Sequence, residues 1–193
     1  MIAQVEKGYY TPEEYLILED KAEARNEYIN GEVIPMAGGT TNHNKIALNF
    51  CRAFPLNINN QDYDIYINDV KLWIPEYQVY TYPDIIVIRD KPIYQKETPT
   101  IVTNPCLIVE VLSKSTQEYD RTDKFKFYRS LPSFQEYILI SQSSYYVEQF
   151  VKSDEEQWLF RVSEGENANL KLQAIDFSLT FQQLYNKVDF ELS

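Results

Sequence analysis

The sequence has few cysteines, no long apolar run and a shortage of basic residues. Cys51 and Cys106 are its two cysteines; they lie far apart within apolar segments. Their positions indicate small buried hydrophobic side chains, and no spacing suggests a disulfide framework or a zinc site. No apolar run reaches the roughly 20 residues that span a bilayer, and residues 1–15 lack the apolar core of a signal peptide. We therefore expect a reduced, cytoplasmic protein with no membrane partner.

Acidic residues outnumber basic ones. Lysine and arginine total 18 against 29 aspartates and glutamates, which gives a formal net charge of −11. This balance argues against tight, non-specific binding to nucleic acid, because neutralising phosphates requires clustered lysines and arginines. The simplest consequence of the acidity is solubility. Any chemistry on nucleic acid must therefore depend on a local site and a divalent cation.

The chain has the size and composition of one globular domain. Its 193 residues are 44% hydrophobic and 24% charged, as in ordinary soluble domains. Sixteen tyrosines and ten phenylalanines favour a strand-rich core. Because the sequence has no internal repeats, low-complexity tracts or long linkers, we expect a single domain over residues 1–193.

Local signals predict a mixed order of helices and strands. A capping box at Thr11–Glu14 begins a helix that we expect to run to about Ala22. Glu27–Ile34 predicts a hairpin around Asn30-Gly31, since both central residues of such a turn need positive φ. Further helices are expected at 43–54, 121–131 and 181–185, and strands at 63–74, 84–88, 106–112, 137–140, 145–151 and 158–162. This order fits an α/β or α+β layer fold, with helices packed on a central sheet.

Two carboxylates occupy positions where charge is costly. Glu110 interrupts the apolar strand of residues 106–112, with Ile108 and Leu112 on its own face, so it needs a partner, a metal or a proton. Asp84 opens the apolar strand 84–88. If these strands pair, both carboxylates can converge at one end of the sheet. Hard cations such as Mg²⁺ or Mn²⁺ bind one or two such carboxylates.

A lysine is expected to approach them. Lys124, Phe127, Tyr128 and Leu131 follow helical spacing and form one stripe. Because Phe127 and Leu131 are expected to face the sheet, Lys124 shares the inward side and could reach the carboxylates. An ammonium there can neutralise a phosphate oxygen or help to activate a water.

Each of these residues also has a plainer interpretation. Glu110 could form a buried ion pair for packing alone, Asp84 could serve a turn, and Lys124 could be a solvated helix lysine. Their joint appearance on adjoining elements favours a functional site, because perturbed charges cluster at such sites.

The same residues carry a family resemblance. Pro83-Asp84 followed by Glu110-Val111-Leu112-Ser113 resembles the core of the PD-(D/E)XK nuclease superfamily, and more narrowly the Uma (type two) family of bacterial restriction endonucleases. The similarity extends from Tyr10 to about Ile140. Its marks are Tyr10–Tyr15, Glu27–Val33, His43, Asp69–Val70, Tyr82–Asp84, Val109–Ser113, Ser115–Thr116, Tyr119–Arg121, Lys124, Tyr128 and Glu136–Tyr137. The resemblance implies a central mixed sheet of the restriction-endonuclease kind, flanked by helices, with extra antiparallel strands.

The resemblance also implies roles. Asp84 and Glu110 match the metal-binding pair, and Lys124 would supply the lysine, because Leu112 stands where the superfamily has it. Glu27 resembles the first acidic motif, and Glu32 is a rival: Ile29 pairs with Glu32 in a two-residue hairpin, so both glutamates share a face.

Further positions stay open at this stage. His43, the single histidine, either supports the metal ligands or contacts phosphate, or it is a cap or partly buried helix residue. Asp69 either adds an acidic ligand or forms a surface ion pair. Lys114 and Ser141 depart from the family pattern, where proline and aspartate are common, and this leaves loop geometry and partner contacts in doubt. Basic residues between Lys114 and Arg129 could follow a phosphate backbone, although a solvated helix face explains them slightly better.

The resulting hypothesis is a magnesium- or manganese-dependent endonuclease that hydrolyses phosphodiester bonds in nucleic acid, with DNA favoured. The alternative is a binding or accessory protein that keeps the nuclease fold without turnover. A two-fold homodimer is compatible with action on duplex DNA, although no residue identifies an interface.

Overall fold

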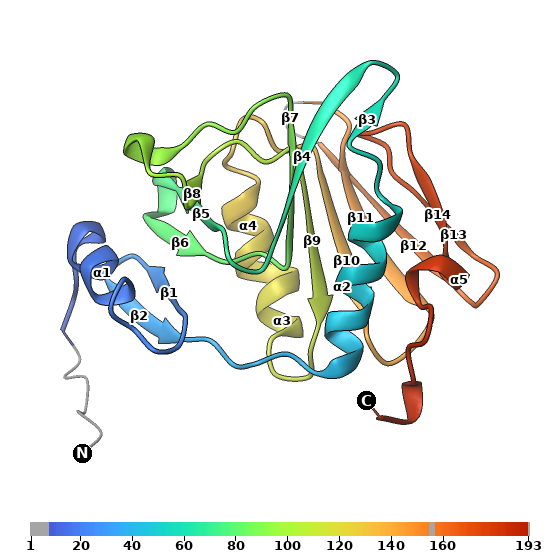
Figure 1. Cartoon of the computed structure of the whole chain (residues 1–193), viewed down its shortest axis with the longest axis horizontal. Coiled ribbons are helices and arrows are strands. Elements are labelled where there is room, and N and C mark those ends of the chain that lie inside the picture. Colours follow the sequence, from blue (N-terminus) through green and yellow to red (C-terminus); the bar gives the residue numbers. More distant parts are fainter. Residues whose placement is uncertain (1–7, 155–156, 193) are drawn as a thin grey trace.

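The structure, a computed structural model, describes residues 8–154 and 157–192. Its centre is a seven-stranded mixed sheet with the order β12-β11-β10-β9-β7-β4-β3. The strands are β3 (Asn57–Ile58), β4 (Gln61–Ile67), β7 (Ile85–Arg89), β9 (Leu107–Leu112), β10 (Glu136–Ser141), β11 (Tyr146–Lys152) and β12 (Trp158–Glu164). Strands β9 and β10 are parallel, and the other neighbours in this sheet are antiparallel. This confirms the expected mixed α/β fold around a central sheet (Figure 1).

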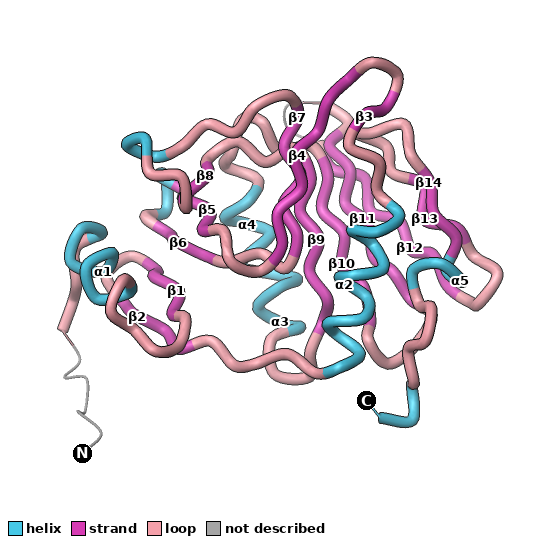
Figure 2. The backbone as a smooth tube through the Cα atoms, in the orientation of Figure 1, coloured by secondary structure: helices cyan, strands magenta, loops and turns pink. Residues whose placement is uncertain are grey.

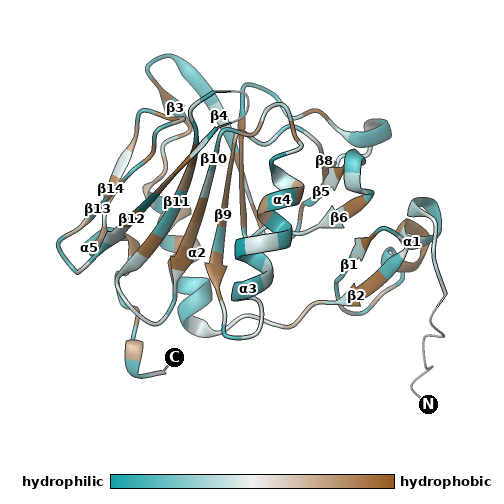
Figure 3. Cartoon of the chain, turned by 180° about the vertical axis from the view of Figure 1, so that it is seen from behind, coloured by the Kyte–Doolittle hydropathy of each residue, from teal (hydrophilic) through white to brown (hydrophobic). Residues whose placement is uncertain are grey.

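Helices cover both faces of the sheet (Figures 1 and 3). Helix α2 (Thr41–Ala53) buries Ile46 and Phe50 against one face. On the other face lies a composite helix, in which α3 (Gln117–Tyr119), the π-helical turn η3 (Asp120–Lys124) and α4 (Phe125–Tyr128) follow one another without a break. All six residues of β9 are buried, as expected of an apolar strand covered on both sides. Strands β9 and β10 are accordingly among the most hydrophobic in Figure 3.

A second sheet lies at the amino-terminal end of the molecule (Figure 1). It has the order β2-β1-β6-β5-β8. Its strands are β1 (Asn26–Ile29), β2 (Glu32–Pro35), β5 (Lys71–Ile74), β6 (Val79–Thr81) and β8 (Ile101–Val102). Helix α1 (Pro12–Glu19) packs its buried Tyr15 against Tyr28 and Tyr80, with ring centroids 5.2 and 5.3 Å away. The capping box at Thr11 and the turn at Asn30 and Gly31, with φ of 44° and 101°, are as expected.

The sequence expectation was wrong about the strand at 63–74. The chain divides there into β4, which belongs to the central sheet, and β5, which belongs to the second. Asn68 causes the break: its φ is 56°, a left-handed conformation that asparagine tolerates better than most residues. The turn between the two strands lies beside Asp84, because Asn68 N–H donates to the Asp84 carbonyl at 3.0 Å.

The other differences concern the ends of helices and short strands that the sequence did not predict. The helix expected at 121–131 already begins at Gln117, and the first helix ends at Glu19. A two-stranded sheet of β13 (Asn169–Lys171) and β14 (Ser178–Thr180) precedes α5 (Phe181–Leu184). No helix in the described ranges has both the length and the apolar character needed to cross a membrane.

Candidate functional site

Strands β7 and β9 bring Asp84 and Glu110 together. Their antiparallel register pairs Ile85 with Val109, so one further step places Asp84 opposite Glu110. The two residues are also tied directly: Asp84 N–H donates to Glu110 Oε2 at 3.2 Å, and Val111 N–H donates to Asp84 Oδ2 at 2.8 Å. Both carboxylates are thus held by backbone amides of the neighbouring strand, which fixes their positions.

Glu110 is almost completely buried, at 3% exposure. Its Oε1 accepts hydrogen bonds from Lys124 Nζ at 3.0 Å and from the Tyr128 hydroxyl at 2.8 Å. Burial raises the pKa of the Glu110 carboxyl; Lys124 opposes this shift, whereas the negative charge of Asp84 reinforces it. A divalent cation would favour the ionised form of this carboxyl.

Lys124 occupies the inward position that the helical stripe predicts. Its Nζ lies 3.0 Å from Glu110 Oε1, 3.1 Å from Asp120 Oδ1 and 3.9 Å from Glu27 Oε1. Burial alone would lower the pKa of Lys124, but the three carboxylates outweigh this effect and hold it well above its usual range. Lys124 is therefore an ammonium ion within a cluster of carboxylates.

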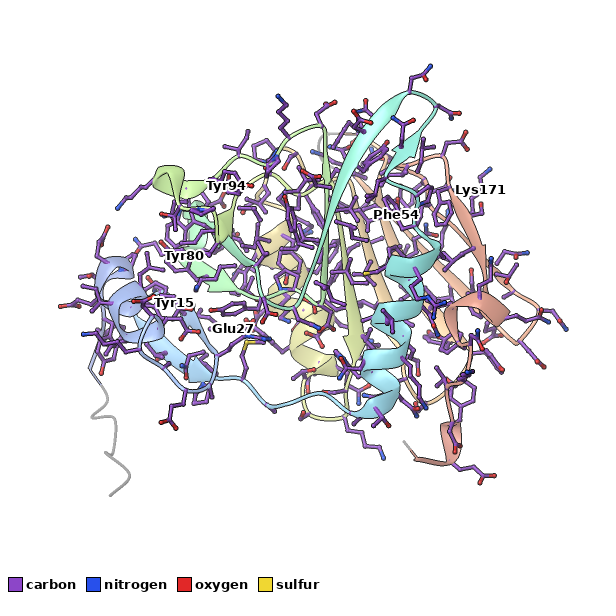
Figure 4. All side chains as sticks on the ribbon, in the orientation of Figure 1. Tyr15, Glu27, Phe54, Tyr80, Tyr94 and Lys171 are labelled. Carbon is purple, nitrogen blue, oxygen red and sulfur yellow. The ribbon has the colours of Figure 1, made fainter. Side chains whose placement is uncertain are left out.

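Glu27 and Glu32 differ in their surroundings. Both lie on the β1–β2 hairpin, and Ile29 pairs with Glu32 as expected. Glu27 is buried, accepts a hydrogen bond from the Thr81 hydroxyl, and lies where the hairpin meets the rest of the molecule (Figure 4). Glu32 is exposed and lies outside the residues that line the cleft in the described part of the chain. The structure therefore brings Glu27, and not Glu32, to the cluster.

His43 reaches Asp84 from the opposite side. It is the third residue of α2, and its Nε2 lies 2.9 Å from Asp84 Oδ2. Asp84 is thus contacted from α2, whereas Glu110 is contacted from the composite helix on the other face of the sheet. Asp69, by contrast, forms an ion pair with exposed Arg25. Of the two interpretations of Asp69, an added acidic ligand or a surface ion pair, the structure shows the ion pair.

The cluster contains two residues that were not expected there from the sequence, Asp120 and Tyr128. Asp120 precedes Lys124 by one helical turn, and Tyr128 follows it by one, so helical spacing could have identified both residues. Asp120 is 2% exposed and Tyr128 is fully buried. Arg121, from the basic patch, makes a two-pronged ion pair with Glu148, and this engages much of its charge inside the protein.

The cluster lies at the base of a cleft of about 1200 Å³. The cleft walls include the loop between β2 and α2, which carries Gly38 and Gly39 (Figure 2), and the segment after β9. Three carboxylates, those of Glu27, Glu110 and Asp120, lie within 3.9 Å of the Lys124 ammonium, and Asp84 adjoins Glu110. This excess of buried negative charge favours a bound cation.

The donor set fits a hard cation with few protein ligands. No group of three or more His, Cys, Asp and Glu side chains in the described residues is arranged to hold a metal. Asp84 and Glu110 could provide two carboxylates, and Mg²⁺ commonly takes that number, completing its shell with waters and substrate phosphate oxygens.

Comparisons with known proteins identify the family of this chain. The sequence profile of the Uma2 family, described as "Putative restriction endonuclease", matches residues 12–182. Uncharacterized protein sll1609 of Synechocystis is 44% identical over 161 residues, covering 83% of this chain and 91% of that protein. Uncharacterized protein slr1290 of the same organism is 36% identical over 180 residues, covering 93% of each. A crystal structure titled as a putative nuclease belonging to DUF820, from Anabaena variabilis, matches with a TM-score of 0.71 at 18% identity, covering 91% of this chain and 97% of that one.

Proposed function

This chain belongs to the Uma2 family, as its sequence motifs indicated, and we propose that it is a metal-dependent endonuclease acting on phosphodiester bonds of nucleic acid, with DNA favoured. One observation carries the proposal: a buried lysine lies 3.0 Å from a buried glutamate whose neighbour in the sheet is an aspartate. A buried ion pair by itself would be equally compatible with a structural role in packing. The adjoining second carboxylate and the open cleft favour chemistry instead.

Each residue has a separate task in this proposal. Asp84 and Glu110 would hold Mg²⁺ or Mn²⁺, which would polarise the scissile phosphate and lower the pKa of an attacking water. Lys124 stabilises negative charge that develops on the phosphate. His43 and Tyr128 orient Asp84 and Glu110 through the contacts at 2.9 and 2.8 Å. Glu27, whose Oε1 lies 3.9 Å from Lys124 Nζ, adds negative charge beside this ammonium.

Cleavage assays test this assignment. We expect the purified protein with Mg²⁺ or Mn²⁺ to nick plasmid or single-stranded DNA, and expect Asp84→Ala and Lys124→Ala to abolish the nicking. Asp69→Ala is the matched control, because Asp69 lines the same cleft but pairs with Arg25 at its rim. Equal cleavage by wild type and both cluster variants would contradict the assigned roles.

A second candidate is a nuclease-fold protein that binds its target without turnover. The net charge of −11 favours it, as does the engagement of Arg121 by Glu148, because both weaken attraction to a polyanion. A metal titration separates the candidates. Stabilisation by Mn²⁺ that disappears in Glu110→Gln supports the enzyme, whereas no response to metal supports the binding protein.

A further inference from the structure

The turn that carries Lys124 has an unusual geometry. Residues Asp120–Lys124 form a π-helical turn between α3 and α4. Such turns are rare in proteins as a whole, and those that occur often lie at functional sites. Its two buried residues are Asp120 and Lys124. The turn therefore directs a carboxylate and an ammonium group into the protein together, one helical turn apart.

Two hydrogen bonds from hydroxyl groups hold Asp120 in place. Its Oδ2 accepts a hydrogen bond from the Thr116 hydroxyl at 2.9 Å, and its backbone carbonyl accepts one from the buried Tyr137 hydroxyl at 3.0 Å. Its Oδ1 is buried and accepts no hydrogen bond from the described residues. That oxygen faces Lys124 Nζ at 3.1 Å. The carboxylate is thus fixed on one side and presents its other oxygen to the lysine.

We propose that Asp120 is a positioning residue that holds the Lys124 ammonium in place beside the ligand pair Asp84 and Glu110. The inference rests on the proposed function, in which Glu110 serves a divalent cation. A carboxylate in that role attracts a second cation less strongly, because the two cations repel each other. Lys124 then needs an anchor that is not itself a ligand, and Asp120 lies on its own helix, tied to Thr116 and Tyr137.

A purely structural ion pair is the competing explanation. Buried ion pairs often contribute little net stability, because desolvation of the two charges offsets their attraction. The two explanations predict different kinetics. Loss of a positioning contact displaces the lysine from the reacting phosphate and lowers kcat, whereas loss of packing disturbs substrate and metal binding as well.

The test compares Asp120→Asn with Asp123→Asn, its exposed neighbour on the same turn. We expect Asp120→Asn to lower kcat for plasmid nicking by about 100-fold, the order of loss for a misplaced reacting group. KM and the Mn²⁺ dissociation constant, measured by calorimetry, should stay within about 2-fold of wild type, as expected when binding and positioning are separable. Asp123→Asn should match wild type throughout. Thr116→Val, which leaves both charges in place, should lower kcat in the same direction.

Two kinetic results would overturn the inference: an unchanged kcat in Asp120→Asn, or a parallel loss of kcat and Mn²⁺ affinity. A readout that needs neither metal nor turnover separates this outcome from failure of the proposed function. In NMR spectra of metal-free protein labelled at lysine Cε, Asp120→Asn should move the Lys124 signal towards that of a mobile, solvated lysine, and Asp123→Asn should not. An unmoved signal contradicts the role of Asp120 even if wild-type protein cleaves nothing. A protein that cleaves nothing contradicts the nuclease proposal alone.

Discussion

Removing Lys124 should destabilise the metal-free protein strongly. The substitution Lys124→Met keeps much of the side-chain volume but leaves Glu110 and Asp120, which lie 3.0 and 3.1 Å from the ammonium, without their cation. Both carboxylates are at most 3% exposed, so solvent screens their charges only weakly. Breaking a buried pair in this way costs about 3–5 kcal/mol. For a protein of this size each kcal/mol lowers Tm by about 2–4 °C.

The free energy of unfolding, measured by urea titration in the presence of EDTA, is the direct readout. Added Mn²⁺ should recover part of the loss, because a cation bound at Asp84 and Glu110 compensates the same charge. The deficit should also be smaller at about pH 5 than at about pH 8: burial raises the pKa of the Glu110 carboxyl, so this group takes up a proton as the pH falls, which removes its uncompensated charge.

Lys126→Met is the matched control. Lys126 is exposed on the same helix, and its ammonium lies 5.2 Å from the centroid of the Tyr77 ring. Losing that contact should cost only about 0.5–1 kcal/mol. If Lys124→Met were as stable as the control at neutral pH, or if its stability did not depend on pH, the reasoning about a buried charge cluster would be refuted.

Two further predictions concern other parts of the molecule. His43→Gln should lower nicking activity or Mn²⁺ affinity by about 10–100-fold, because His43 supports a proposed ligand through its contact with Asp84; metal titration and kinetics unchanged from wild type would contradict that support. Burial raises the pKa of the Cys106 thiol to about 11, so little thiolate forms at neutral pH. Native protein should therefore resist iodoacetamide at Cys106, and modification should increase as the pH rises towards that value. Rapid labelling of Cys106 in folded protein, measured by mass spectrometry, would argue against the buried position.

The sequence predicts the central features of the fold well, for identifiable reasons. Apolar runs such as Leu107–Leu112 can be satisfied only in strands covered on both faces. The hairpin at Asn30-Gly31 follows from backbone conformation alone. These signals are local, so periodicity and turn chemistry suffice to identify them.

Other features of the fold and the site have no clear signal in the sequence. The division of 63–74 into two sheets follows from a single left-handed residue, Asn68, and the β-branched and aromatic residues around it concealed the break. Within the cluster, spacing along the chain could place Lys124, with Asp120 and Tyr128, on one side of the helix, but it could not show that Glu27 reaches this lysine. That contact joins the β1–β2 hairpin to the composite helix, with Glu27 Oε1 3.9 Å from Lys124 Nζ.

The placement of the lysine on a helix also explains an apolar residue on the strand. Leu112 lies two residues after Glu110, where the resemblance leads one to expect a lysine. In the structure Leu112 is buried and packs in one apolar cluster with Ile108 and Phe127. A lysine at that position would remove apolar surface that packs with Ile108 and Phe127. With Leu112 completing the packing, the composite helix supplies the charge from the side, where Asp120 and Glu110 can share it. The strand residue Leu112 thus supplies packing and the helix residue Lys124 supplies charge, whereas a lysine at position 112 would have to do both.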